Sequence, residues 1–334
     1  MFHFSTRNAL LPSAAMTILL GLSACGGGGG SDPAPADSTT TTTASGAAAA
    51  AAAGTVTTTT TPPPTTPPPA AGPLSITGLT DFRSTKPNTL VNFAAATPNT
   101  VVEKPITGLT AGDIVVGIDV RPANGLMYAF ARADVGGAPT GAASIYLINP
   151  DSGAVSGRVA VSGVTFDGAT SVSVDFNPVV DRMRVITFFG QSVAINVADG
   201  IAVASPAVQG TGFAAAVAYT NSAVSATAPA STVLYRIDNQ GTPDDLTTIT
   251  PATGAIATTA GPIGFNLDEV QAFDIGGATN QNSLAALRTT ASGAHTLYRI
   301  NLTTGAATLF NATAALSLIG GAAGVPLVDI AIRP

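Results

Sequence analysis

A short phrase built around an aspartate recurs along residues 74–334 and limits the possible folds more than any other feature. Its copies lie at Gly117–Pro122, Val174–Pro178, Val217–Asn221, Phe273–Gly276 and Val328–Pro334. Aligned on the aspartate column, successive copies are 56, 43, 56 and 55 residues apart, and Ala218 replaces the aspartate in the third copy. Periods of about 40–55 residues are typical of propellers and solenoids.

A second phrase follows later in each unit and has the chemistry of a strand. Its copies are Ile145–Asn149, Val193–Asn196, Leu234–Asp238 and Leu297–Asn301. Val, Ile, Thr and Tyr alternate with polar residues around these phrases, and Asn/Asp/Gly turns separate them. Such patterns predict short antiparallel strands joined by tight turns. Each unit is therefore predicted to hold about four strands, near 114–120, 126–132, 144–148 and 154–161 in the first.

The two ends of the repeat region predict how the units are arranged. The last copy leaves room for one strand, Val328–Ile332, whereas three strand-like runs precede the first full copy: Leu74–Asp81, Thr89–Ala94 and Thr100–Ile106. Three strands and one strand make a complete unit, and closing a ring removes the exposed edge strand of an open array. The sequence therefore predicts an all-β propeller of five four-stranded blades, closed by strands from both termini.

The first 25 residues are typical of a bacterial lipoprotein leader. Met1–Ala24 contains Arg7 and a mostly apolar run, Ala9–Leu22, which is too short to span a bilayer as a helix. The run leads into Leu22-Ser23-Ala24-Cys25, which resembles a lipobox and holds the only Cys of the chain. We expect residues 1–24 to be a signal peptide and Cys25 to carry the lipid anchor. The alternative is a plain secreted protein with an incidental Cys.

Residues 25–73 are expected to form a disordered tether between the anchor and the propeller. The segment is rich in Gly, Thr, Ala and Pro, lacks aromatic residues, and carries only two charges, Asp32 and Asp37. Such a composition cannot bury a core. As a coil, residues 26–73 would span roughly 40 Å. By analogy with bacterial lipoproteins, Gly26 is compatible with sorting to the outer membrane, so we expect a lipid-anchored protein of the cell envelope.

The phrases around the first two aspartates resemble a known bacterial family. The runs Ile106–Ala129 and Asp175–Val185, followed by Ala218–Asn221, are similar to the family called domain of unknown function 4394. The similarity covers nearly all of residues 74–334. It implies a secreted or surface-attached protein, and it supplies no catalytic residue.

Composition excludes several kinds of chemistry. Only 10% of residues are charged and the net charge is −6, which argues against a nucleic-acid partner because phosphate binding needs a basic surface. His295 is the one His beyond the leader, so no metal site of nitrogen and sulfur ligands is expected. The sequence has no loop of spaced acidic residues that would predict a calcium site. It also lacks the Gly-x-Ser-x-Gly motif that would predict a serine nucleophile. We therefore expect no cofactor. We also expect His295 to lie in a turn that faces the solvent.

The aspartate column provides the first candidate ligand site. Asp119 and Asp175 lie on the predicted innermost strands, and Arg121 and Asn177 follow them by two residues, hence on the same strand face. These side chains could form a polar ring that binds an anion or a glycan at the mouth of the channel. Alternatively, each aspartate caps a turn or bonds a neighbouring blade, as repeat architectures require.

A second candidate site breaks the symmetry of the repeats. The run Asp181-Arg182-Met183-Arg184 occurs once, and its two arginines share a face if the segment is a strand. An arginine fork suits a carboxylate or phosphate, but the run could equally hold a local Asp–Arg pair.

Two classes of function remain open at this point. The first is an envelope-anchored binding or structural module, which contacts the membrane through its lipid and whose partner is a glycan or an envelope protein. The second is an enzyme that acts on envelope glycans or another extracellular substrate through Asp and Arg groups in the channel. A buried aspartate with a raised pKa beside Arg182 or Arg184 would favour the enzyme.

Overall fold

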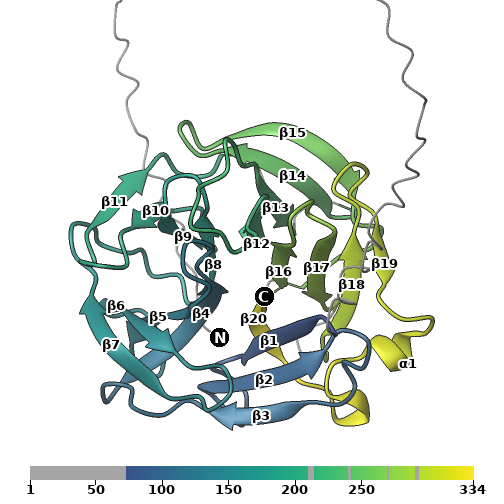
Figure 1. Ribbon diagram of the computed structural model, residues 1–334, viewed down its shortest axis with the longest axis horizontal. Helices are drawn as coiled ribbons and strands as arrows, with labels where there is room; N and C mark the ends of the chain where they lie inside the picture. The colour runs from purple at the N-terminus through teal and green to yellow at the C-terminus, as the bar shows by residue number, and fades with distance from the viewer. Residues whose placement is uncertain (1–72, 210–213, 240–241, 269–270, 290–292) are drawn as a thin grey trace, which may run out of the picture. The chain divides into compact units, whose positions relative to one another are not determined.

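The computed structural model describes residues 73–334, except 210–213, 240–241, 269–270 and 290–292. These residues belong to one compact unit, Thr66–Pro334. Its strands form five four-stranded antiparallel sheets around a central axis, which makes a five-bladed β-propeller (Figure 1). The predicted all-β fold and blade number are confirmed. The predicted signal peptide, Cys25 and almost all of the tether lie outside the described residues.

Each blade runs from an innermost to an outermost strand. Blade 1 holds β4 (Asp113–Val120), β5 (Met127–Ala133), β6 (Ala143–Ile148) and β7 (Val155–Ala160). Blade 2 holds β8 (Val172–Asn177), β9 (Arg182–Thr187), β10 (Ser192–Ile195) and β11 (Ala202–Ser205). Blade 3 holds β12 (Ala214–Tyr219), β13 (Leu234–Asp238), β14 (Asp245–Thr250) and β15 (Ala255–Pro262). Blade 4 holds β16 (Ala272–Gly276), β17 (Asn282–Leu287), β18 (Thr296–Ile300) and β19 (Ala307–Leu309).

Blade 5 joins the two ends of the propeller, as the sequence predicts. Its strand order is β20 (Leu327–Ile332), β1 (Ser75–Thr80), β2 (Thr89–Ala94) and β3 (Val102–Pro105). The strand β20 pairs with β1 in antiparallel register, from Ile76 opposite Ile332 to Leu79 opposite Asp329. The last strand of the chain is thus the innermost strand of a blade whose other strands come first (Figure 1).

The apolar side chains of the described residues gather into five clusters, one between each pair of neighbouring blades. Ile118 and Leu79 pack between blades 5 and 1, and Phe130 and Phe176 pack between blades 1 and 2. The other three interfaces are built in the same way. Every residue of β20 is buried, whereas β7 and β3 are mostly exposed. Burial therefore falls from the axis outward, and each sheet packs both of its faces on neighbouring sheets.

Tight turns at the rims of blades 1 to 4 pack against the preceding blade. Gly153, between β6 and β7, has a φ of 76°, and a Cβ there would lie 2.3 Å from the carbonyl oxygen of Pro105. The Gly153 carbonyl accepts a hydrogen bond from the N–H of Thr107 at 3.0 Å. The repeated Gly after the second phrase thus meets a need for positive φ and for close approach of two backbones.

Helix is almost absent from the described residues. A single α-helical turn, α1 (Ala314–Ser317), and a 3₁₀ turn, Gly321–Ala323, lie between β19 and β20. In this part of the chain no helix has the length and apolar character needed to cross a membrane.

Candidate functional site

Four buried aspartates fasten the innermost strands to one another around the axis. We call Asp119, Asp175, Asp274 and Asp329 the Asp ring. The Asp329 carboxylate accepts the N–H of Ile118 on β4 at 2.9 Å, and that of Asp119 accepts the N–H of Phe176 on β8 at 2.7 Å. An innermost strand has one unpaired edge, and its buried N–H groups need acceptors. Each carboxylate supplies such an acceptor to a strand of a neighbouring blade.

The remaining two members of the ring continue this pattern. Asp175 accepts the backbone N–H of Tyr219 on β12, and Asp274 accepts the N–H of Ile332 on β20 at 2.6 Å. Between the innermost strands of blades 3 and 4, β12 and β16, this carboxylate is missing, because Ala218 occupies the aspartate position in blade 3. All four ring members thus bond a neighbouring blade, and a role for them in ligand binding stays a prediction.

The ring members are 2–6% exposed, and this burial governs their ionisation. Burial raises the pKa of Asp119, Asp175 and Asp329 well above the ordinary aspartate value, and the charges of other ring members raise it further. Burial also raises the pKa of Asp274, to about 6. Among the described residues no Lys or Arg forms an ion pair with a ring member. The ring is thus a set of interacting carboxyl groups that favours the neutral form.

The Asp ring has the raised pKa of catalytic groups but not their access. Asp175 lies opposite Arg184 in the β8–β9 ladder, and its Oδ1 is buried with no hydrogen-bond partner in the described part of the chain. None of the three described pockets is lined by a ring member. Nor does any group of three acidic, His or Cys side chains in the described ranges stand close enough to hold a metal ion.

Arg184 lies between blades 2 and 3 and not at the channel mouth. Its guanidinium is buried and donates to the Tyr219 Oη at 3.3 Å, to the Ser192 Oγ at 3.1 Å and to the Ser205 Oγ at 2.6 Å. These hydroxyls come from strands on both sides of the interface. Arg182 lies on the same face of β9 and is partly exposed. The two predicted arginines therefore have different surroundings, and Arg184 is part of the scaffold.

Asp181 pairs with Arg121 of the neighbouring blade and not with the arginines that follow it. The Arg121 Nε donates to Asp181 Oδ1 at 2.7 Å, and Nη2 donates to Oδ2, which makes a two-pronged ion pair. This hydrogen bonding lowers the pKa of Asp181 and raises that of Arg121. Asn177 ends β8 and caps the next turn, since its Oδ1 accepts the N–H of Val179 at 2.9 Å. The pair and the turn lie on the face where the innermost strands end, which we call the exit face.

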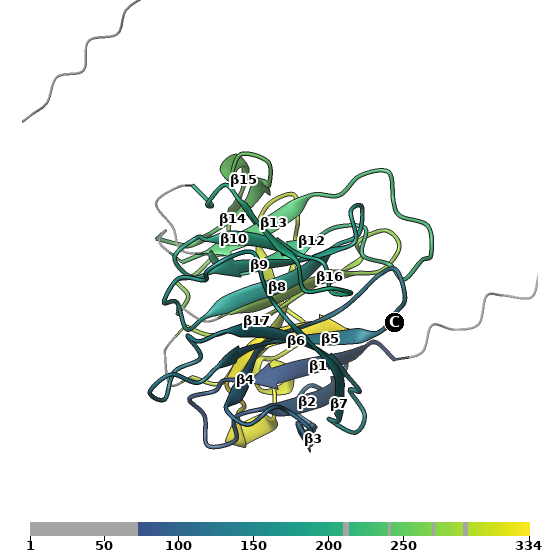
Figure 2. The ribbon, with the colours of Figure 1, turned by 90° about the vertical axis from the view of Figure 1, so that its left-hand side faces the viewer.

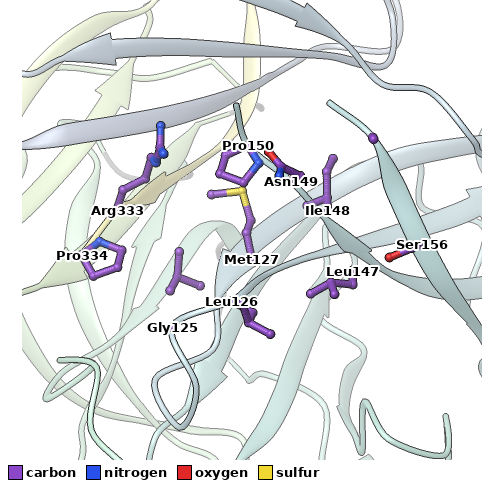
Figure 3. Close-up of a pocket in the computed structure, with 12 residues that line it drawn as sticks. Gly125, Leu126, Met127, Leu147, Ile148, Asn149, Pro150, Ser156, Arg333 and Pro334 are labelled. Carbon is purple, nitrogen blue, oxygen red and sulfur yellow. The ribbon is translucent and has the colours of Figure 1, made fainter. Parts of the chain in front are cut away.

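Two adjoining pockets of about 400 and 430 Å³ form a groove on the exit face. Both are lined by Val120, Arg333 and Pro334, so the end of β20 separates them. The C-terminus marks this face in the side view (Figure 2). Figure 3 shows the first pocket, with Arg333 and Pro334 on one side and Leu147 and Ser156 on the other. We call the two pockets together the exit-face groove.

The groove is mostly apolar and has one cationic border. Leu126, Met127 and Ile148 line the first pocket, and Val224 lines the second. The Arg333 guanidinium reaches Asp151 at 2.8 Å, and a quarter of the arginine side chain remains exposed. The arrangement can bind a ligand that has apolar surface and an anionic or hydrogen-bonding group.

Apolar side chains are also exposed in the exit-face loops of blades 1 to 3. Leu126 is 47% exposed, Val224 45% and Val180 57%. The loop that holds Val224 is fixed to blade 1, because the N–H of Ser225 donates to the Pro122 carbonyl at 2.9 Å. Blades 1, 2 and 3 each contribute a loop, so this surface breaks the symmetry of the ring.

Sequence reasoning was wrong about one residue and missed two contacts at this face. His295 is fully buried, not solvent-facing, and its Nδ1 accepts the N–H of Leu327 at 3.0 Å, so it orders the start of β20. The pair of Arg121 and Asp181 joins positions 60 residues apart. The pair of Arg333 and Asp151 joins positions 182 residues apart. A repeat alignment shows which positions are equivalent, but not which loops meet.

The family comparison agrees with the repeat phrases and the fold. Residues 89–323 match the family described as domain of unknown function (DUF4394). The chain belongs to this family. Among curated proteins, none matches the chain.

Solved structures give only distant likenesses. The crystal structure of BamB from Moraxella catarrhalis is 14% identical over 69% of this chain and 56% of that chain, with a TM-score of 0.29. A calcium-binding protein, regucalcin, from Agrobacterium tumefaciens is 11% identical over 65% of this chain and 68% of its own, with a TM-score of 0.37. The chain thus spans little more than half the length of BamB.

Proposed function

We propose that this DUF4394 protein is a lipid-anchored binding module of the bacterial cell envelope. Support for the anchor comes from the lipobox Leu22–Cys25 and from the tether-like composition of residues 26–73. Two or more acyl chains on one Cys hold a protein stably at a membrane, unlike a single chain. Gly26 favours sorting to the outer membrane over retention at the inner membrane.

The observation that carries the binding role is the exit-face groove. It combines concave apolar walls, a partly exposed guanidinium and a rim of exposed Leu and Val side chains. A concave site with apolar walls and a few polar groups is typical of ligand-binding sites. Asp175 meets one expectation for the enzyme alternative, since it is buried, has a raised pKa and lies opposite Arg184. It is only 2% exposed and lines none of the three described pockets, so we favour the binding role.

Fractionation of cells tests the anchor. Cys25→Ser should release the protein from membranes and abolish labelling by an alkyne fatty acid, because the thiol that accepts the lipid is gone. Gly26→Asp is the matched control: it should keep the label and move the protein to the inner membrane. Unchanged fractionation and labelling of Cys25→Ser would refute the anchor.

Site-specific photocrosslinking in cells tests the binding surface. A photoreactive residue in place of Leu126, at the groove, should give a discrete crosslinked product. The same residue in place of Val203, which is 60% exposed on the outer strand β11, should not give this product. Equal products at both positions, or none at Leu126, would contradict a ligand at the exit face.

A further inference from the structure

The tether joins the propeller at the exit-face groove. Pro73, the last residue of the tether, and Leu74 line the second pocket of the groove, and β1 begins at the following residue. The Leu74 carbonyl accepts the N–H of Ala95 at 2.8 Å, which fixes this point of entry on blade 5. Along the chain, the exit face is therefore the face nearest to the proposed lipid on Cys25.

Three loops of this face expose apolar side chains. Leu126 lies before β5, Val180 lies between β8 and β9, and Val224 lies between β12 and β13. Each of these residues is 45–57% exposed. Their transfer into the headgroup region of a bilayer removes apolar surface from water, which is favourable. We call these three residues the apolar tips.

Contacts between blades hold the three loops in one platform. The Arg121 guanidinium in the blade-1 loop bonds both carboxylate oxygens of Asp181 in the blade-2 turn. The blade-3 loop is fixed to the same blade-1 loop, because the N–H of Ser225 donates to the Pro122 carbonyl at 2.9 Å. A surface that is already ordered loses little conformational entropy when it binds. The apolar tips can therefore meet a flat surface together.

The segments that follow the innermost strands carry an excess of positive charge. They hold three arginines and one carboxylate, and neither Lys nor Glu, in the ranges 121–126, 178–182, 220–233, 277–281 and 333–334. The whole chain, in contrast, has a net charge of −6. Arg182 is partly exposed and, among the described residues, forms no ion pair. Arg333 pairs with Asp151 and keeps a quarter of its side chain exposed. Guanidinium groups suit phosphate oxygens, so this face complements lipid phosphates.

We propose that the exit face docks on the phospholipid surface of the membrane that holds the anchor, with the apolar tips in the headgroup region and Arg182 and Arg333 on lipid phosphates. The inference rests on the proposed anchor and names the partner of the exit-face groove. A phospholipid has the apolar part and the anionic group that the groove can bind. Because the tether makes docking intramolecular, a weak affinity of the face is enough to orient the propeller.

Flotation of the mature chain with vesicles tests the face without its anchor. The chain from residue 25 with Cys25→Ser carries no lipid, so any binding comes from the protein surface. It should bind vesicles of phosphatidylcholine and phosphatidylglycerol in equal parts at least about fivefold more tightly than vesicles of phosphatidylcholine alone, since an anionic surface attracts each exposed arginine. No flotation with the mixed vesicles at millimolar lipid would overturn the inference.

Three variants of this chain locate the contact. Val180→Asp should weaken binding at least about tenfold, because it removes an apolar tip and adds a negative charge. Val135→Asp is the matched control: Val135 is 59% exposed after β5, at the opposite end of its blade, and its replacement should leave binding unchanged. Arg182→Gln should weaken binding about fivefold on the mixed vesicles only. Equal binding by the Val180→Asp and Val135→Asp variants would refute docking through the exit face.

The crosslinked product at Leu126 in cells separates this inference from the broader binding role. Docking predicts an adduct whose added mass is that of one phospholipid. A glycan or protein adduct at Leu126 would keep the groove as a binding site and overturn the lipid contact. The absence of any adduct would contradict both, while release of Cys25→Ser from membranes tests the anchor separately.

Discussion

At the scale of single residues, the Asp ring shows why a charge-poor chain keeps four aspartates at its centre. The innermost strands bring N–H groups without a strand partner into buried positions, and carboxyl oxygens of the neighbouring blade accept hydrogen bonds from them. Burial opposes the charged form, so the ring keeps its hydrogen bonds while favouring protonation. The ring is a set of acceptors more than a set of charges.

Replacing Asp119 with Leu or with Asn separates its role as a hydrogen-bond acceptor from the effect of its charge. Leu leaves the N–H groups of Phe176 and Val120 without their acceptor, which should cost about 2–4 kcal/mol of stability. Asn keeps an acceptor oxygen and should cost much less. Urea unfolding of both variants measures the difference, and equal losses would mean that the hydrogen bonds do not hold the blades.

Stability should fall as pH rises through the pKa values of the ring. The folded state binds these protons more tightly than the unfolded chain, so the stabilisation is complete below the ordinary value near 4 and is lost as pH rises through the folded value. For Asp274 that window runs from about 4 to about 6, and the loss is on the order of 3 kcal/mol. The raised pKa values of the other three carboxyl groups extend this pH window to higher pH.

Urea unfolding across this window checks the sign. The free energy of unfolding should drop between about pH 4 and pH 6 and should keep falling above pH 6 as the other ring members ionise. Asp274→Asn cannot titrate and should flatten the early part of the drop. A stability that rises steadily over this range would show that the ring is ionised in the folded protein.

At the scale of strands, the sequence predicts positions well and partners poorly. The predicted strands of blade 1 fall within one residue of the observed ones, because alternation and turn residues are local properties. Burial of His295 and the place of Arg184 between blades are not local. They depend on which face of one sheet packs against the neighbouring sheet, and the sequence of a single repeat unit does not predict that packing.

The strand β20 is the element on which ring closure depends. All six of its residues are buried, it pairs with β1, and it supplies Asp329 to the Asp ring. Removing residues 327–334 should therefore cost several kcal/mol, a large share of a typical 5–15 kcal/mol. Thermal unfolding followed by circular dichroism should show a much lower midpoint, or no folded protein.

A shorter truncation controls for the loss of chain length. Removing only Arg333 and Pro334 deletes the ion pair with Asp151 but leaves β20 whole, and exposed ion pairs contribute little. This variant should melt within a few degrees of the full domain. If the longer truncation also melts there, the terminal strand does not close the ring.

At the scale of the whole molecule, the chain forms a ring that closes on itself, and its loops form a groove at the exit face. The same four-stranded blade occurs five times, so the fold follows from repetition, whereas the exit-face groove is formed by loops that differ between blades. The repeated aspartate phrase marks the innermost strand of each blade. Arg121 and Arg333 occupy positions that the other copies of the phrase fill with other residues, and both lie at the exit face.

Hydrogen exchange of the amides of β20 tests the closed ring most directly. In a closed propeller these amides open only when the whole domain unfolds, so their protection should match the free energy of global unfolding measured in urea. The outer strand β3, which is mostly exposed, serves as the weakly protected reference within the same sample. Exchange of residues 327–332 as fast as that of β3 would mean that the ring is open, and would contradict the central claim.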